Sequence, residues 1–121
     1  MTTIQKTTGN RGENEALQFL TQQGLRLREK NFSCYFGEID LIMQDTEHIV
    51  FVEVRCRAHS SYGSAADSIT PAKIKKLIKA ATCYLQWKKC LHKVHSRFDI
   101  VAIDFNSTEK KISWLKNAFT A

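Results

Sequence analysis

Residues 37–57 read GEIDLIMQDTEHIVFVEVRCR, two apolar runs on either side of a polar turn at 44–47. Each run is typical of a β-strand that is largely buried, and each carries one acid within its apolar part, Asp40 in the first and Glu53 in the second. A buried carboxylate is costly unless it is paired with a cation or bound to a metal ion. Two such acids on neighbouring strands therefore indicate a site for a divalent cation.

The pairing of these two strands decides whether the acids meet. Side chains alternate between the two faces of a strand, so Glu38, Asp40 and Ile42 are expected on one face of the first strand, and Glu53 and Arg55 on one face of the second. In an antiparallel hairpin, one register sets Asp40 directly opposite Glu53, and a shift of two residues sets Glu38 opposite Glu53 instead. Either register gathers the acids and Arg55 on one face, whereas a shift of one residue would separate them.

Electrostatics favours a counter-ion between the acids. Two carboxylates ~5 Å apart repel each other by about 3 kcal/mol at an effective dielectric constant of 20. A hard cation such as Mg²⁺ relieves this repulsion through oxygen ligands and keeps water positions open. An internal pair of Glu53 or Asp40 with an arginine, tying the sheet together, fits the same spacing.

Further elements extend from this hairpin in both directions. Helical periodicity predicts a first helix over 12–23 and a second that begins at Pro71 with Thr70 as its N-cap. The remaining expected strands cover about 25–32, 98–105 and 111–115. The order α-β-β-β-α-β-β predicts a single α/β domain over 1–121 with a central mixed sheet flanked by helices, and a flexible N-terminus at 1–9.

Charge distribution and hydrophobic runs limit the classes of partner that fit this chain. The 121-residue chain has a formal net charge of +6, and no acid occurs between Asp67 and Asp99 although eight lysines and arginines do. This distribution favours a polyanionic partner, and a solvated lysine-rich helix face is the alternative. No run is long enough for a membrane span and no secretory signal begins the chain, so we expect a cytoplasmic protein without a membrane partner and with reduced cysteines.

Several motifs together carry a resemblance to a known family. Asp40, twelve intervening residues and then Glu53-Val54-Arg55 resemble the core of PD-(D/E)xK nucleases. Over nearly the full chain, the sequence is similar to the bacterial YraN family. The stretches that carry this similarity are Gly9-Asn10-Arg11-Gly12-Glu13, Gly37-Glu38-Ile39-Asp40-Leu41-Ile42, Phe51-Val52-Glu53-Val54-Arg55, Thr70-Pro71-Ala72-Lys73 and Arg97-Phe98-Asp99-Ile100-Val101-Ala102. The resemblance implies a restriction-endonuclease-like fold similar to that of archaeal Holliday-junction resolvases.

The resemblance also implies roles for individual residues. Asp40 and Glu53 would be ligands of Mg²⁺ or Mn²⁺, and Glu13 would complete the acidic cluster. Active nucleases of this class usually have lysine where this chain has Arg55, which stays protonated and cannot act as a base, although it can steady a phosphate. Lys73, at the start of the second helix, is a candidate for the missing ammonium group. The proline of the class name is absent, since Ile39 precedes Asp40.

The sequence thus favours a metal-dependent endonuclease that hydrolyses phosphodiester bonds of DNA, with branched or structured DNA among its substrates, acting as a monomer or a homodimer. Its catalytic residues would be Glu13, Asp40, Glu53 and Arg55, and its nucleic-acid contacts Lys73, Lys75, Lys76, Lys79 and Arg57. Two alternatives stay open. One is a catalytically inactive nucleic-acid-binding module that retains the fold, and the other is an interaction protein whose acids form an internal salt-bridge network.

Overall fold

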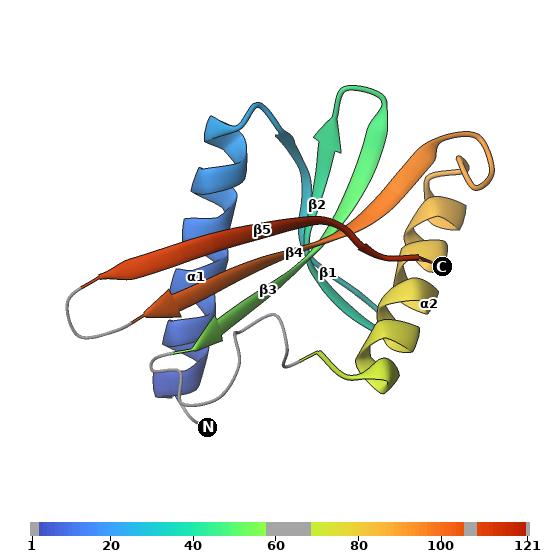
Figure 1. Cartoon of the computed structure of the whole chain (residues 1–121). Helices are drawn as coiled ribbons and strands as arrows, with labels where there is room; N and C mark the ends of the chain where they lie inside the picture. The colour runs from blue at the N-terminus through green and yellow to red at the C-terminus, as the bar shows by residue number, and fades with distance from the viewer. Residues whose placement is uncertain (1–2, 58–68, 106–108, 121) are drawn as a thin grey trace.

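The protein is a five-stranded sheet between two helices. A computed structural model describes residues 3–57, 69–105 and 109–120. Its elements, in chain order, are α1 (Thr3–Gln22), β1 (Arg26–Cys34), β2 (Gly37–Asp45), β3 (His48–Arg57), α2 (Pro71–Trp87), β4 (His95–Phe105) and β5 (Lys110–Phe119). Helices α1 and α2 cover opposite faces of the sheet (Figure 1). The predicted order and the α/β class are confirmed.

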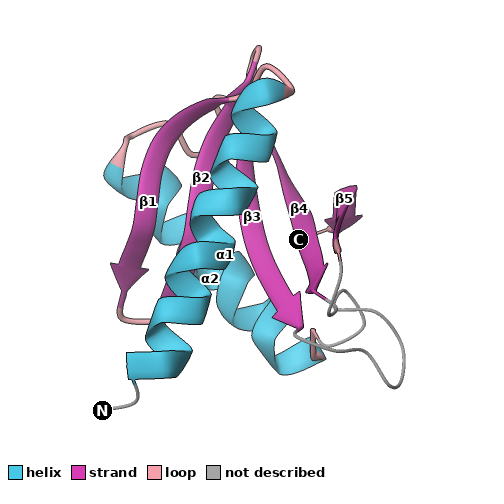
Figure 2. Ribbon diagram, turned by 90° about the vertical axis from the view of Figure 1, so that its left-hand side faces the viewer, coloured by secondary structure: helices cyan, strands magenta, loops and turns pink. Residues whose placement is uncertain are grey.

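The sheet is mixed, and its strands lie side by side in sequence order from β1 to β5 (Figure 2). Strands β1, β2 and β3 form an antiparallel meander, β4 runs parallel to β3, and β5 returns antiparallel to β4. The parallel step requires a crossover, and the chain makes it through α2. Because β3 has a neighbour on each side, its apolar residues are covered laterally as well as by the helices.

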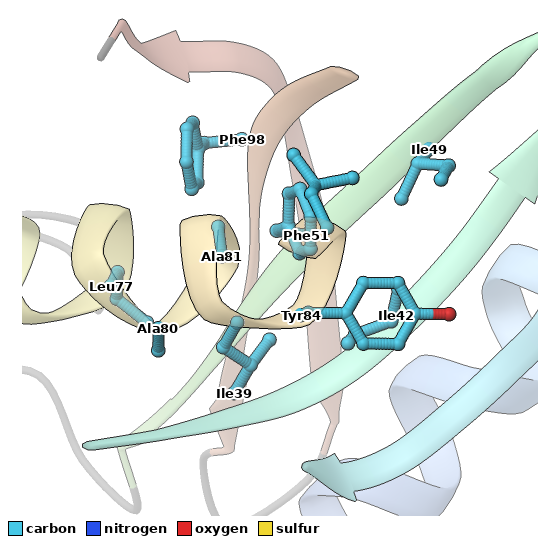
Figure 3. Close-up of a cluster of buried hydrophobic side chains, with 10 residues drawn as sticks. Ile39, Ile42, Ile49, Phe51, Leu77, Ala80, Ala81, Tyr84 and Phe98 are labelled. Atoms are coloured by element: carbon cyan, nitrogen blue, oxygen red, sulfur yellow. The ribbon is translucent and has the colours of Figure 1, made fainter. Parts of the chain in front are cut away.

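Helix α2 begins as the sequence predicts. Thr70 is its N-cap, with the hydroxyl accepting a hydrogen bond from the Lys73 amide at 3.1 Å, and Pro71 occupies the first turn, where no backbone donor is needed. The helix lays its apolar side on the sheet, where Tyr84 packs edge-on against Phe51 with ring centroids 6.0 Å apart (Figure 3). This packing fixes α2 on the sheet, with Lys73 of its first turn beside Glu53 of β3.

Helix α1 packs on the other face through small residues. Ala16 and Leu20 are fully buried against β2, β3 and β4. At Gly12 the helix approaches β3 so closely that an added Cβ would lie 2.1 Å from Cys56 Sγ. Glycine at this position therefore allows the contact that brings the next residue, Glu13, towards the sheet.

The start of α1 differs from the prediction. The helix begins at Thr3 rather than at Gly12, so the predicted boundary was wrong. Its first nine residues contain a single large apolar side chain, Ile4, and so carry no amphipathic signal that the sequence analysis could detect. The flexibility expected for 1–9 stays a prediction.

Within the described part of the chain, no helix is long and apolar enough to cross a membrane. The four cysteines are free thiols, as expected.

Candidate metal and nucleic-acid site

The β2–β3 register brings the two acids of the hairpin together. Leu41 pairs with Val52 as the last recorded partners, so Asp40 and Glu53 occupy the next opposed positions, where the ladder ends. Of the two registers expected from the sequence, this is the one that sets the two acids opposite each other. Beyond the end of the ladder, the Val54 amide donates to the side chain of Asp40, at 2.9 Å from Oδ2. The carboxylate of Asp40 thus satisfies a backbone donor at the point where β2 and β3 stop pairing.

Simple alternation fails in β2 beside Asp40. Ile39 and Ile42 both belong to the core under α2, whereas Leu41 and Met43 belong to the core under α1. Strict alternation would place Ile39 with Leu41, so the expectation that every second residue from Glu38 to Ile42 shares one face was wrong. The local irregularity frees Asp40 from the regular pleat and lets its side chain reach Val54.

Glu53 is the buried acid of the site. Its relative exposure is 3%, and it lies on the face covered by α2. Arg55 Nη1 donates to its Oε2 at 3.2 Å, and Lys73 Nζ lies 3.7 Å from the same oxygen. The other oxygen, Oε1, is buried and accepts from no N–H donor, while the side chains of Glu53 and Asp40 share a hydrogen bond. One oxygen of this carboxylate is therefore matched by two cations, and the group otherwise faces a second carboxyl.

The electrostatics of the acids follows from their burial. Loss of solvation, followed by the nearby charge of Asp40, raises the pKa of Glu53 to about 7. Burial also raises the pKa of Asp40, against the opposing effect of the hydrogen bond from Val54. The free protein therefore holds two carboxyls that ionise reluctantly side by side, and a bound cation would favour the ionised form of both.

Glu13 reaches the same region from α1. Burial and the charge of Asp40 raise the pKa of the Glu13 carboxyl, while a hydrogen bond with the Asn31 side chain opposes this rise. Its Oε1 is buried without a hydrogen-bond partner. Among the described residues, however, no three side chains of His, Cys, Asp or Glu are grouped to hold a metal ion. The structure thus presents Asp40 and Glu53 as a pair, with Glu13 as a neighbour.

The donor set of the pair fits a hard cation. Both groups offer carboxylate oxygens, the ligands that Mg²⁺ and Mn²⁺ prefer. The fit is supported by Glu53 Oε1, which is buried without an N–H donor, and by the hydrogen bond between the Glu53 and Asp40 side chains, which places two carboxyls side by side. Arg55 and Lys73 on Oε2 already neutralise part of the charge.

The expected nucleic-acid contacts divide into two groups. Lys73 points into the site, with its ammonium group 3.7 Å from Glu53 Oε2, and its role in place of the usual lysine stays a prediction. Lys75, Lys76 and Lys79 are exposed on α2. The side chain of Arg57 lies outside the described residues.

Two features near the site were missed from the sequence. The amide of Val54 has no signal in the sequence, because its availability depends on where the strand ladder ends. The second feature is the pair of exposed aromatic residues Tyr35 and Phe36, directly before Gly37. Here a signal existed, since turns between strands are usually built from Gly, Asn, Asp, Ser or Pro.

Comparison with known proteins places the chain in a family. Residues 12–103 match the model of the family described as "Uncharacterised protein family UPF0102". A UPF0102 protein of Alkalilimnicola ehrlichii is 53% identical over 114 residues, covering 94% of this chain and 87% of the relative. Another, of Herminiimonas arsenicoxydans, is 52% identical over 116 residues, covering 96% and 89%. The chain therefore belongs to the UPF0102 family, which is the YraN family of the restriction-endonuclease-like superfamily.

Proposed function

We propose that this protein is a metal-dependent endonuclease that hydrolyses phosphodiester bonds of DNA. The observation that carries the proposal is the buried, hydrogen-bonded pair of Glu53 and Asp40, in which Glu53 Oε1 has no N–H donor while Arg55 and Lys73 lie on the opposite oxygen. In metal-dependent phosphodiester hydrolysis, a bound cation activates water and neutralises charge on the phosphate. The residues of this site supply both signs of charge within a few ångströms.

Each residue has a role in the proposed reaction. Asp40 and Glu53 would hold Mg²⁺ or Mn²⁺, which when bound activates water and polarises the phosphate. Arg55 stays protonated and would steady the negative charge of the scissile phosphate, because a guanidinium can donate two parallel hydrogen bonds. Lys73 would provide the ammonium group that the class usually carries two residues after the second acid. Glu13 would support the cation or its water from α1.

The wider surface suits a nucleic-acid partner. Helix α2 contains no acid in its 17 residues, and Lys75, Lys76 and Lys79 are exposed on it. These lysines would contact phosphates without reading sequence, so binding should weaken steeply as salt concentration rises. Branched or structured DNA belongs among the substrates to be tested, and the protein would act as a monomer or a homodimer in the cytoplasm.

A second candidate function is a nucleic-acid-binding module without hydrolysis. It is favoured by the two cations on Glu53 Oε2, which compete with a metal ion for the same carboxylate. Within the described residues, the pair also lacks a third acid close enough to complete a metal cluster. This candidate predicts binding to DNA that survives chelation and no cleavage at any metal concentration.

The test is a cleavage assay with Mg²⁺ and Mn²⁺ on single-stranded, duplex, flapped and four-way-junction DNA. Wild type is compared with Asp40→Asn, Glu53→Gln, Arg55→Lys and Lys73→Met. We expect both acid variants to lose at least about 100-fold in cleavage rate, as loss of a metal ligand's charge removes several kcal/mol of charge stabilisation. Arg55→Lys should retain or increase activity. Asp40→Asn should keep its thermal stability, because an amide oxygen can still accept from Val54.

A second measurement separates the two candidates. The melting temperature of each variant is followed with and without Mn²⁺, which should stabilise wild type and leave Asp40→Asn and Glu53→Gln unchanged. Stabilisation of wild type together with acid-dependent cleavage supports the nuclease. Salt-sensitive DNA binding without cleavage, and with no shift on adding Mn²⁺, would replace it by the inert module.

A further inference from the structure

The turn between β1 and β2 carries two aromatic side chains in solvent. Tyr35 is 96% exposed and Phe36 is 44% exposed, and their rings meet edge-to-face with centroids 5.3 Å apart. Neither side chain is needed to fill the core. Their mutual contact holds the two rings in a defined arrangement at the tip of the hairpin.

A hollow lies between this tip and α2. It has a volume of about 270 Å³, opens to solvent and is lined by Phe36, Ile78, Lys79, Thr82, Cys83 and Gln86. The walls are mainly apolar, with the amide of Gln86 exposed at one side. Lys79 Nζ lies 5.7 Å from the centre of the Phe36 ring, so a positive charge stands directly beside the aromatic wall. An apolar, flat-walled hollow next to a cation suits a planar ring joined to an anionic backbone.

The hollow belongs to the same strip of surface as the acidic pair. Lys73 contacts Glu53 and Lys79 contacts Phe36, and six residues of helix span about 9 Å. Along β2, the four residues from Phe36 to Asp40 span about 13 Å. Lys76 lies between the two points, beside Gly37, where an added Cβ would be 3.7 Å from its own. Exposed lysines thus lead from the acids to the aromatic tip.

The aromatic rings beside the lysines favour a binding surface over a merely solvated helix face. A solvated helix face needs no exposed aromatic pair beside it, and aromatic rings interleaved with lysines are typical of proteins that bind single-stranded nucleic acid by stacking on its bases. We infer that the hollow beside Phe36 binds an unpaired nucleobase of a DNA strand whose phosphates follow Lys79, Lys76 and Lys75 towards Asp40 and Glu53. The inference rests on the proposed function for the direction of the strand and names its substrate class: DNA with unpaired bases next to the cleavage point.

The experiment measures binding in the absence of divalent metal, so that it does not depend on cleavage. Fluorescence anisotropy compares a single-stranded thymidine oligonucleotide with the same oligonucleotide carrying abasic sites, in EDTA. Wild type should bind the base-bearing strand about 10-fold more tightly than the abasic one, since stacking of a base on an aromatic ring contributes at that level. Phe36→Leu keeps an apolar wall without a flat ring and should lose most of this ratio.

Trp87→Leu is the matched control. Like Phe36, Trp87 is an exposed aromatic residue, but it lies on α2, stacks on Phe32 and does not line the hollow. It should keep the wild-type ratio. Circular dichroism melts check that both variants fold. An unchanged ratio in Phe36→Leu, or an equal loss in Trp87→Leu, would overturn the inference even if the protein cleaves DNA. A base-dependent ratio that needs Phe36, in a protein that never cleaves, would support the inference and reject the nuclease. Failure of wild type to bind either strand would overturn both.

Discussion

Glu53 is the residue at which the chemistry of this molecule is concentrated. It is nearly inaccessible, shares a hydrogen bond with the carboxyl of Asp40, and has two cations on one oxygen and no N–H donor on the other. Replacing a buried ion pair by apolar residues often stabilises a protein, so an arrangement of this kind is weak support for stability. The free-energy cost of burying these charges is the reason why we propose a metal ion at this site.

The raised pKa of Glu53 predicts how stability depends on pH. The folded protein holds the proton up to about pH 7, whereas the unfolded chain releases it near the ordinary value of 4.5. Between these values the folded state binds more protons, so the free energy of unfolding should fall as pH rises from about 4.5 to about 7, by up to about 3 kcal/mol. Urea unfolding of the metal-free protein across pH 4.5–8 measures this decline.

Two variants test whether Glu53 causes this decline in the free energy of unfolding. Glu53→Gln cannot ionise and should flatten the decline, while Glu47→Gln, which changes an exposed acid in the β2–β3 turn, should reproduce the wild-type curve. Equal slopes in wild type and Glu53→Gln would show that another group is responsible.

At the scale of elements, Asp99 joins β4 to β5 at an irregularity of the sheet. The register of this pair shifts between Phe98 and Ile100, and Asn117 adopts a φ of 52° opposite the shift. Asp99, 1% exposed, accepts from the Asn117 amide at 2.9 Å, from Trp114 Nε1 at 2.9 Å and from Arg97 Nε at 3.0 Å. Arg97 stands two residues before Asp99 on the same strand, and the other two donors, from β5, make the carboxylate the anchor of β5.

Asp99→Ala should therefore destabilise the protein by about 3 kcal/mol or more, because it leaves buried donors and a cation without their acceptor. Asp45→Ala is the control, since Asp45 accepts from the same arginine at 2.9 Å but is partly exposed. It should cost about 1 kcal/mol or less. Thermal or urea unfolding of the two variants measures the difference, and similar losses would contradict a special role of Asp99.

At the scale of the whole molecule, the two helices hold the site from opposite faces of the sheet. Helix α2 delivers Lys73 to Glu53, and α1 delivers Glu13 to the neighbourhood of Asp40. The distance between α1 and the sheet depends on Gly12, which meets Cys56 with no room for a Cβ. The layer spacing and the position of Glu13 are therefore coupled.

Gly12→Ala should lower the free energy of unfolding by about 1–2 kcal/mol, since overpacking against Cys56 outweighs the better helix propensity of alanine. The double variant Gly12→Ala, Cys56→Ala removes the clashing sulfur and should recover most of this loss. A double-mutant cycle by urea unfolding gives the coupling between the two positions. Additive effects would mean that the crowding is relieved elsewhere.

Much of this architecture is readable from the chain alone. Alternating and apolar runs predict the strands, the Thr70-Pro71 pair predicts where α2 begins, and the order of elements predicts a mixed sheet with helices on its faces. These features depend on local propensity and on periodicity, which act within about ten residues. The acids Asp40 and Glu53 also stand out locally, because charge inside an apolar strand is unusual.

Other features were decided by contacts between distant residues. The break of alternation beside Asp40 and the register shift between β4 and β5 follow no local pattern. Local patterns in the chain suffice to predict the fold class and two acidic positions on adjacent strands. Folding of the whole chain is needed before Asp40 takes the amide of Val54, Lys73 shares an oxygen of Glu53 with Arg55, and Phe36 borders a hollow on α2. The reason is that burial, pKa and partner choice depend on what the rest of the chain packs around each group, and that packing exists only once the layers have formed.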